Sequence, residues 1–101
     1  MLNSNMSNSS KTNIGIVGVG HLGSFHVEQY QKLDDVNIVG FYDTNSAQSN
    51  QVKNKYNINA FDSLEKLLAT CNAISIVTPT TTHFKIAKQA MEMGCHVFIE
   101  K

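Results

Sequence analysis

The sequence predicts an α/β domain in which a parallel β-sheet is covered by helices on both faces. Three observations support this fold class. Residues Ile14–Val17 form a short β-branched run that breaks into glycines at positions 18, 20 and 23. Apolar runs then alternate with segments of helical periodicity as far as Ile99, a pattern typical of parallel strands joined by right-handed crossovers. No repeat or linker interrupts the 101 residues, a length that suits one domain.

The first half of the chain is predicted to alternate strand, helix, strand and helix. Asn13–Val17 is the first strand, and His21–Lys32 has apolar residues near helical spacing. Val36–Tyr42 is nearly continuous in apolar residues, as expected where both faces of a parallel sheet are covered. Ser46–Tyr56 is a polar helix whose ends are hard to predict, because it contains asparagines, which are poor helix formers.

The second half continues the alternation. Asp62-Ser63-Leu64-Glu65 has the spacing of a capping box that opens a helix carrying Leu67 and Leu68. Pro79 ends a strand because it lacks a ladder donor, and Gly94 is placed to end a helix. The other predicted elements are a short strand at Ala60-Phe61, a buried strand at Ala73–Val77, a helix at Thr82–Met93 and a final strand at His96–Ile99.

The glycine segment has the spacing of a dinucleotide-binding fingerprint of the Rossmann type. Gly18 suits the tight turn out of the strand, Gly20 lets the backbone touch a pyrophosphate, and Gly23 lets the helix pack close to the sheet. Free N–H groups at the helix start then provide an anion site. The candidate cofactor contacts in this loop are Gly18, Val19, Gly20, His21, Leu22 and Gly23. The alternative is a purely structural turn.

Asp43 follows the second predicted strand, twenty positions after Gly23. A carboxylate there accepts hydrogen bonds from the adenosine ribose hydroxyls and repels a 2′-phosphate, which favours NAD over NADP. Neither Thr44 nor Asn45 offers a guanidinium, although Lys53 or Lys55 could compensate weakly. The alternative for Asp43 is a solvated carboxylate at a strand end.

Composition argues against several other functions. Eight lysines balance eight acidic residues, arginine is absent, and no charged field attracts nucleic acid or an anionic membrane. Residues 1–12 form a polar leader without the apolar run of a secretory signal, and no segment approaches the roughly 18 apolar residues of a membrane span, so we expect a cytoplasmic protein. Cys71 and Cys95 have neither a paired nor a metal-like spacing and are expected to be buried and reduced, with no metal site. The eleven asparagines are given no functional weight.

The motifs of the second half resemble a known family. These motifs are Val77-Thr78-Pro79-Thr80, then His83, then Gly94-Cys95-His96-Val97-Phe98-Ile99-Glu100-Lys101. Together with the glycine loop and His26, they resemble the nucleotide-binding domain of the Gfo/Idh/MocA oxidoreductases, over residues 13–101. In that family a Glu-Lys-Pro motif ends the fifth strand, and Glu100 and Lys101 match its first two residues.

The resemblance implies a role for each matching residue. Lys101 would be the catalytic residue that assists proton transfer at the reacting carbon, with Glu100 among the cofactor contacts. Thr78 and Pro79 would line the crevice that holds the nicotinamide half of the cofactor. His83 would approach the nicotinamide, or it simply caps or packs; for His26 and His96 packing is expected.

The resemblance also implies an oxidoreductase that transfers hydride between NAD and a sugar, a cyclitol or a related substrate. The family's C-terminal substrate domain is absent from these residues, so we expect residues 13–101 to be a truncated cofactor domain that is not catalytic alone. A homo-oligomer is expected only for the full-length protein. The alternative function is a non-catalytic NAD(H)-binding module or redox sensor.

Overall fold

The computed structural model describes residues 11–18, 21–78 and 80–99, and the predicted order of elements is confirmed there. The elements are β1 (Thr12–Val17), α2 (His21–Gln31), β2 (Val36–Tyr42), α3 (Ser46–Tyr56), α4 (Leu64–Thr70), β3 (Ala73–Ile76), α5 (Thr80–Glu92) and β4 (His96–Ile99). Thr12 belongs to β1 rather than to the predicted leader, because its N–H donates to the Asp35 carbonyl at 3.0 Å. No described helix is long and apolar enough to cross a membrane.

Several predicted boundaries change. Helix α5 begins at Thr80 rather than Thr82. At Ala60, where a short strand was predicted, there is only an isolated bridge to Phe41. The predicted capping box starts at Asp62, but the N-cap of α4 is Ser63, one residue later. The Ser63 hydroxyl accepts the Lys66 N–H at 3.2 Å.

Helix α3 keeps its predicted bounds despite its poor helix formers, because asparagine caps it at both ends. The Asn45 side chain accepts the Gln48 N–H at 3.0 Å, which satisfies a donor that the first turn leaves unpaired. Asn57 adopts the left-handed conformation, with φ at 55°, and its N–H bonds to the Lys53 carbonyl. Capping therefore offsets weak helix propensity here.

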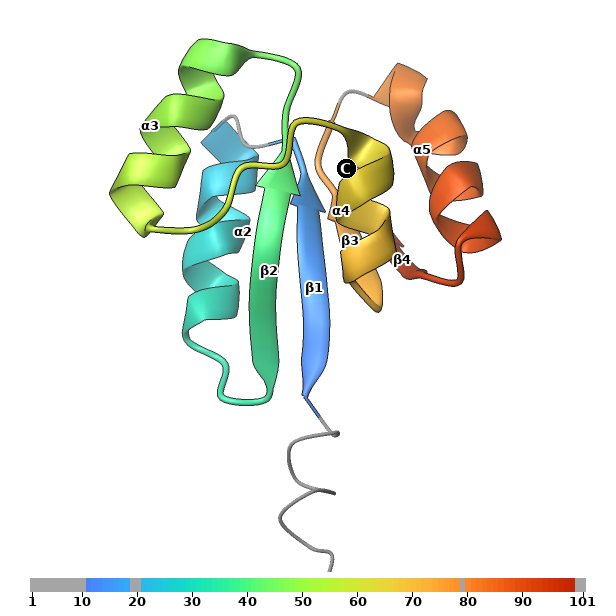
Figure 1. The fold of residues 1–101 in the computed structure, drawn as a ribbon, viewed down its shortest axis with the longest axis horizontal. Coiled ribbons are helices and arrows are strands. Elements are labelled where there is room, and N and C mark those ends of the chain that lie inside the picture. The colour runs from blue at the N-terminus through green and yellow to red at the C-terminus, as the bar shows by residue number, and fades with distance from the viewer. Residues whose placement is uncertain (1–10, 19–20, 79, 100–101) are drawn as a thin grey trace, which may run out of the picture.

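The four strands are parallel and lie in the order β2-β1-β3-β4 (Figure 1). The direction in which the chain adds strands reverses between β1 and β3, which makes that gap a topological switch point. A register shift occurs where Ile14 and Gly15 of β1 oppose Ile38 and Gly40 of β2, so β2 has a bulge at Val39. All four strands run toward the same edge, called here the carboxyl edge.

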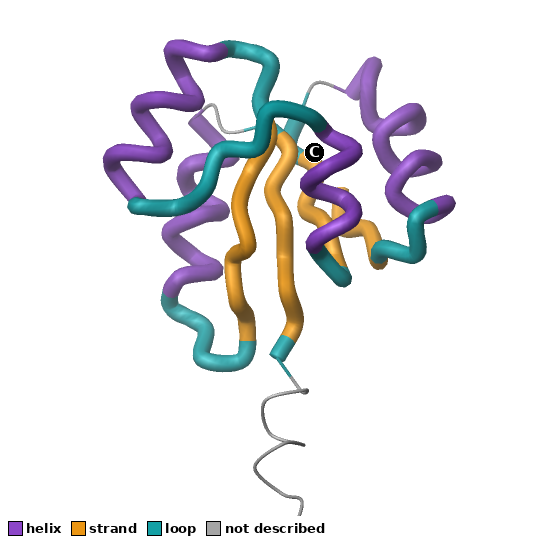
Figure 2. Tube along the Cα trace, viewed as in Figure 1, coloured by secondary structure: helices purple, strands orange, loops and turns teal. Residues whose placement is uncertain are grey.

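Helices cover both faces of this sheet (Figures 1 and 2). On one face, α2 and α3 bury Val27 and Val52 against Ile16 and Phe41 of the sheet. On the other face, α4 lies over β1 and β2 and α5 lies over β3 and β4. The core there contains Val17, Leu67, Leu68, Ile74, Ile76, Ala87 and Ala90. The doubly covered parallel sheet predicted from the sequence is thus confirmed.

Candidate cofactor site

The carboxyl ends of β1, β2 and β3 meet in register. Val17 is level with Tyr42 of β2 and with Ile76 of β3. The ladder continues beyond the strands, because the Gly18 N–H donates to the Tyr42 carbonyl and the Val77 N–H donates to the Val17 carbonyl, both at 2.9 Å. The residues after the three strands, Gly18, Asp43 and Val77-Thr78, therefore lie at one edge. Ligands of open parallel sheets bind at such an edge.

Gly18 makes the tight turn predicted for it, with φ at +91°. A Cβ at this position would lie 3.0 Å from Cγ2 of Thr78 and 3.1 Å from the Val77 carbonyl carbon. Both the backbone conformation and the space therefore require glycine. The loops that follow β1 and β3 pack directly against each other at the switch point.

The rest of the glycine loop is described only in part. Val19 and Gly20 lie outside the described residues, so the pyrophosphate contact stays a prediction. Helix α2 begins at His21 as predicted; the side chains of His21 and Leu22 are not described. Gly23 is buried in the first turn of α2, which agrees with close packing of this helix on the sheet.

Asp43 follows β2 directly, and its carboxylate is held by its own loop. The Oδ1 atom accepts the Asn45 N–H at 2.8 Å, and Asn45 in turn caps α3. Asp43 is half-buried and lines an open hollow of about 610 Å³, to which Lys53 also contributes. Lys55, the other lysine considered from the sequence, lies on a different hollow.

Thr78 and His83 are joined at the end of β3. His83 lies near the start of α5 and is 8% exposed, and its Nε2 is 2.5 Å from the Thr78 carbonyl oxygen. Of the two roles considered for His83, the structure shows packing and a backbone hydrogen bond; the nicotinamide contact stays a prediction. The Thr82 hydroxyl also donates to the Thr78 hydroxyl at 2.8 Å, a contact that no sequence signal indicated.

The remaining candidate residues separate into two groups. Pro79, Glu100 and Lys101 lie outside the described residues, so their proposed roles are not tested. His26 packs between the rings of Phe25 and Tyr30, as expected, whereas His96 is exposed and the packing expected for it is wrong. Among the described residues no group of histidine, cysteine and carboxylate side chains could hold a metal ion.

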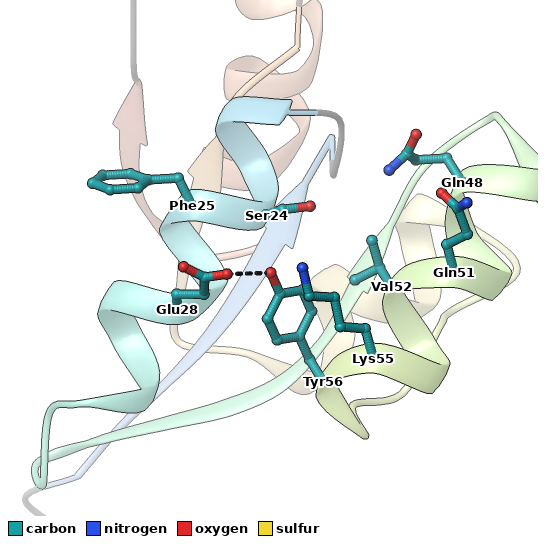
Figure 3. A pocket seen from close by; sticks show the side chains of 8 residues that line it. All are labelled: Ser24, Phe25, Glu28, Gln48, Gln51, Val52, Lys55 and Tyr56. Carbon is teal, nitrogen blue, oxygen red and sulfur yellow. Dashed lines mark hydrogen bonds between the residues drawn. The ribbon is translucent and has the colours of Figure 1, made fainter.

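A larger hollow, of about 1090 Å³, lies between α2 and α3 (Figure 3). Its walls include Glu28 and Tyr56, whose carboxylate and hydroxyl point toward each other and form a 2.5 Å hydrogen bond. This bond raises the pKa of Tyr56, and Lys55 lies 5.2 Å from the centre of the same ring. Among the described residues, Asp43 lines the smaller hollow and not this one, so the smaller hollow is the better candidate for a dinucleotide site.

A sheet of this order, with a glycine turn at the switch point and a carboxylate after β2, defines a dinucleotide-binding α/β domain. Comparison with known proteins gives the family. Residues 12–101 match the GFO_IDH_MocA family, described as an oxidoreductase family with an NAD-binding Rossmann fold. The chain belongs to this family, as the resemblance from the sequence implied.

Several dehydrogenases are similar to this chain. A UDP-N-acetylglucosamine 3-dehydrogenase of Acidithiobacillus ferrooxidans is 44% identical over 87 residues, which are 86% of this chain and 27% of that protein. A solved structure of this enzyme from the same organism has a TM-score of 0.84 at 42% identity and covers 90% of this chain and 29% of that one. A WlbA dehydrogenase of Bordetella pertussis, solved with NADH and UDP-GlcNAcA, has a TM-score of 0.82 at 29% identity, with coverages of 90% and 29%.

A myo-inositol 2-dehydrogenase of Thermotoga maritima is 26% identical over 91 residues, which are 87% of this chain and 27% of that protein. The chain therefore spans little more than a quarter of the length of the relatives it matches. It corresponds to the NAD-binding Rossmann domain of this oxidoreductase family.

Proposed function

We propose that this domain binds NAD(H) rather than NADP(H) at the carboxyl edge, as the cofactor domain of a dehydrogenase. The tight turn at Gly18, packed against Thr78, supports the proposal, because it brings the ends of β1 and β3 together at the switch point where such sheets bind dinucleotides. The bound nicotinamide would supply the hydride acceptor or donor. The residues of this chain would bind and orient it.

The observation that carries the preference for NAD is the fixed carboxylate of Asp43. Its Oδ1 is oriented by the Asn45 N–H, so the group stands at the end of β2 where a ribose hydroxyl donates to a carboxylate. A 2′-phosphate placed there would face a negative charge at close range. The chain contains no arginine that would hold such a phosphate in a bidentate bond.

The substrate proposed is a sugar or cyclitol carbon that carries a hydroxyl group. Oxidation would transfer the hydride from that carbon to the nicotinamide and release the hydroxyl proton to a base, leaving a carbonyl. By resemblance, Lys101 is the residue that assists this proton transfer, and Glu100 contacts the cofactor. The 44% identity to a UDP-N-acetylglucosamine dehydrogenase favours a nucleotide-linked amino sugar within the class.

Turnover is proposed to need groups that these 101 residues do not contain. The relatives are more than three times as long as the segment they share with this chain, which leaves ample length for a substrate-binding part. Lys101 also needs surrounding side chains to hold it in place and to tune its basicity. Purified chain mixed with NAD⁺ and a UDP-linked amino sugar should give no increase in NADH absorbance, and steady NADH production would contradict this proposal.

Calorimetric titration tests the cofactor assignment. Wild-type chain should bind NAD⁺ and NADH saturably and NADPH more weakly. Replacing Asp43 by asparagine removes the charge but keeps the shape, so NADH affinity should fall about tenfold, the loss of one charged hydrogen bond. The matched control is Asp34→Asn, on the turn before β2 at the opposite end of the strand, which should bind like wild type. Equal affinity of Asp43→Asn and wild type would contradict the assignment.

A further inference from the structure

His83 is a buried polar side chain in the first turns of α5 whose ring faces back to the end of β3. Only 8% of it is exposed, and Nε2 lies at hydrogen-bonding distance from the Thr78 carbonyl oxygen. A carbonyl oxygen only accepts hydrogen bonds, so Nε2 carries the proton. The geometry therefore selects the Nε2–H form of the imidazole.

The same helix holds Thr78 at a second point. The Thr82 hydroxyl donates to the Thr78 hydroxyl at 2.8 Å. Helix α5 thus binds both the main-chain carbonyl and the side chain of Thr78, which is the second residue after β3. A loop residue fixed at two points has little freedom to move relative to the helix.

The position of Thr78 matters because Gly18 lies directly opposite. Cγ2 of Thr78 would be only 3.0 Å from a Cβ at Gly18, and the Thr78 nitrogen would be 3.2 Å away. The loops after β1 and β3 are therefore closely packed against each other. A shift of Thr78 by a few tenths of an ångström would therefore change the spacing of the two loops at the switch point.

We infer that His83 is a positioning residue for the cofactor site. It holds the Thr78 carbonyl, and with it the loop after β3, at the distance from Gly18 that a bound dinucleotide requires. The inference rests on the proposed function, and it assigns His83 an action through Thr78 rather than a contact with the nicotinamide. A ring that only filled space would need no donor at Nε2.

Two substitutions distinguish the hydrogen bond that His83 donates from the packing of its ring. His83→Phe keeps an aromatic ring but leaves the Thr78 carbonyl without its partner. His83→Gln places an amide N–H where Nε2–H stood. We expect the phenylalanine variant to lose about tenfold in NADH affinity by calorimetry, because a partly buried carbonyl is left unsatisfied, and the glutamine variant to stay within about threefold of wild type.

The matched control is His96→Gln, at an exposed position on the amino end of β4, which should bind NADH like wild type. NADH affinity of His83→Phe equal to that of wild type would overturn the inference. Loss in His83→Gln as large as in His83→Phe would also overturn it. Thr82→Val, which removes the hydroxyl bond to Thr78, should lower the affinity about threefold and serves if the His83 variants do not fold.

A cofactor-independent measurement keeps this inference distinct from the proposed function. Nitrogen-15 NMR of the histidine rings in the free chain should show His83 as the Nε2–H tautomer, with a proton that exchanges slowly with water. A neutral Nδ1–H tautomer would overturn the inference whatever the binding result. Failure of the wild-type chain to bind NADH, with the Nε2–H tautomer present, would contradict the proposed function.

Discussion

The two ends of the same three strands use polar residues in opposite ways. At the amino end, Asn13, Asn37 and Asn72 bond to one another: the Asn13 N–H donates to the Asn72 side chain, and the Asn37 amide donates to the Asn13 side chain, both at 3.0 Å. At the carboxyl end, the Asp43 side chain bonds instead to Asn45 in its own loop, and the Thr78 side chain bonds to Thr82 of α5. The amino ends of the three strands are thereby linked by hydrogen bonds. At the carboxyl end, Asp43 lines the open hollow described above.

Cysteines complete the amino end. The Sγ atoms of Cys71 and Cys95 lie 3.9 Å apart as free, buried thiols, and Cys95 also bonds to the Cys71 carbonyl. Their burial in the free state confirms the expectation from the sequence, whereas their proximity in space was not predicted. This difference between the ends teaches that substitutions at the amino end should change stability alone, and substitutions at the carboxyl end should also change binding.

Glycine substitutions at the two ends give the sharpest contrast. Gly18 and Gly94 both have positive φ, +91° and +84°, but a Cβ at Gly94 would meet nothing within 4 Å. Gly94→Ala should lower the free energy of unfolding by about 1 kcal/mol, the cost of the left-handed backbone. Gly18→Ala adds crowding against Thr78 and should lower it by about 3 kcal/mol.

Denaturant unfolding measures both changes, and calorimetry measures NADH binding. We expect Gly18→Ala to lose detectable binding and Gly94→Ala to retain wild-type affinity, since Gly94 lies at the amino end of β4. Equal destabilisation by the two substitutions would show that crowding of the added Cβ against Thr78 has no energetic cost. That result would contradict the comparison.

The lysine charge in the hollow of Asp43 should have a smaller effect, on the selectivity between NADH and NADPH. Lys53 lines the same hollow as Asp43, and Lys55 does not. In Asp43→Ser the ratio of NADH to NADPH affinity should fall about tenfold, because a 2′-phosphate then meets a lysine without the carboxylate. Adding Lys53→Gln should lower the NADPH affinity about threefold and so reverse part of the gain, since an exposed charge contributes little.

Adding Lys55→Gln instead is the control and should leave the ratio unchanged. The gain in NADPH affinity should also shrink at high salt, which screens an exposed lysine. A NADPH gain that survives Lys53→Gln in full would exclude Lys53 from the site.

Titration of the cysteine pair should make the free energy of unfolding depend on pH only at high pH. Burial, together with the neighbouring Cys95 thiol, raises the pKa of Cys71 from 9.0 to about 12. The folded chain keeps this proton where the unfolded chain releases it, so the stabilisation is complete below pH 9 and is lost as the pH rises toward 12. The free energy of unfolding should therefore fall more steeply over this range in wild type than in Cys71→Ala.

Denaturant unfolding at several pH values checks this difference, and NADH affinity at neutral pH should be the same in both proteins. Parallel pH profiles would mean that Cys71 does not titrate abnormally. A change in NADH affinity would mean that the two ends of the sheet are coupled.

Much of the fold was predictable because its signals are local. The predicted bounds of β2, α3 and β4 are confirmed. Those of β2 and β4 follow from the hydrophobic pattern, whereas the asparagine caps that fix the ends of α3 were not predicted. The N-cap of α4 was misassigned by one residue, because Asp62 and Ser63 are both good caps and the packing of the helix decides between them. The asparagines at the amino end were given no weight, since their partners lie up to 59 positions away.

The sequence by itself determined the alternation of elements, the need for glycine at position 18 and the acidic residue after β2, because these depend on backbone conformation and on neighbours along the chain. Only the tertiary structure decided that His83 and Thr82 hold Thr78, that Thr78 packs on Gly18, and that Lys53 rather than Lys55 shares a hollow with Asp43. The physical reason is that these contacts depend on how strands and helices lie against one another in three dimensions. The spacing of residues along the chain does not specify that arrangement.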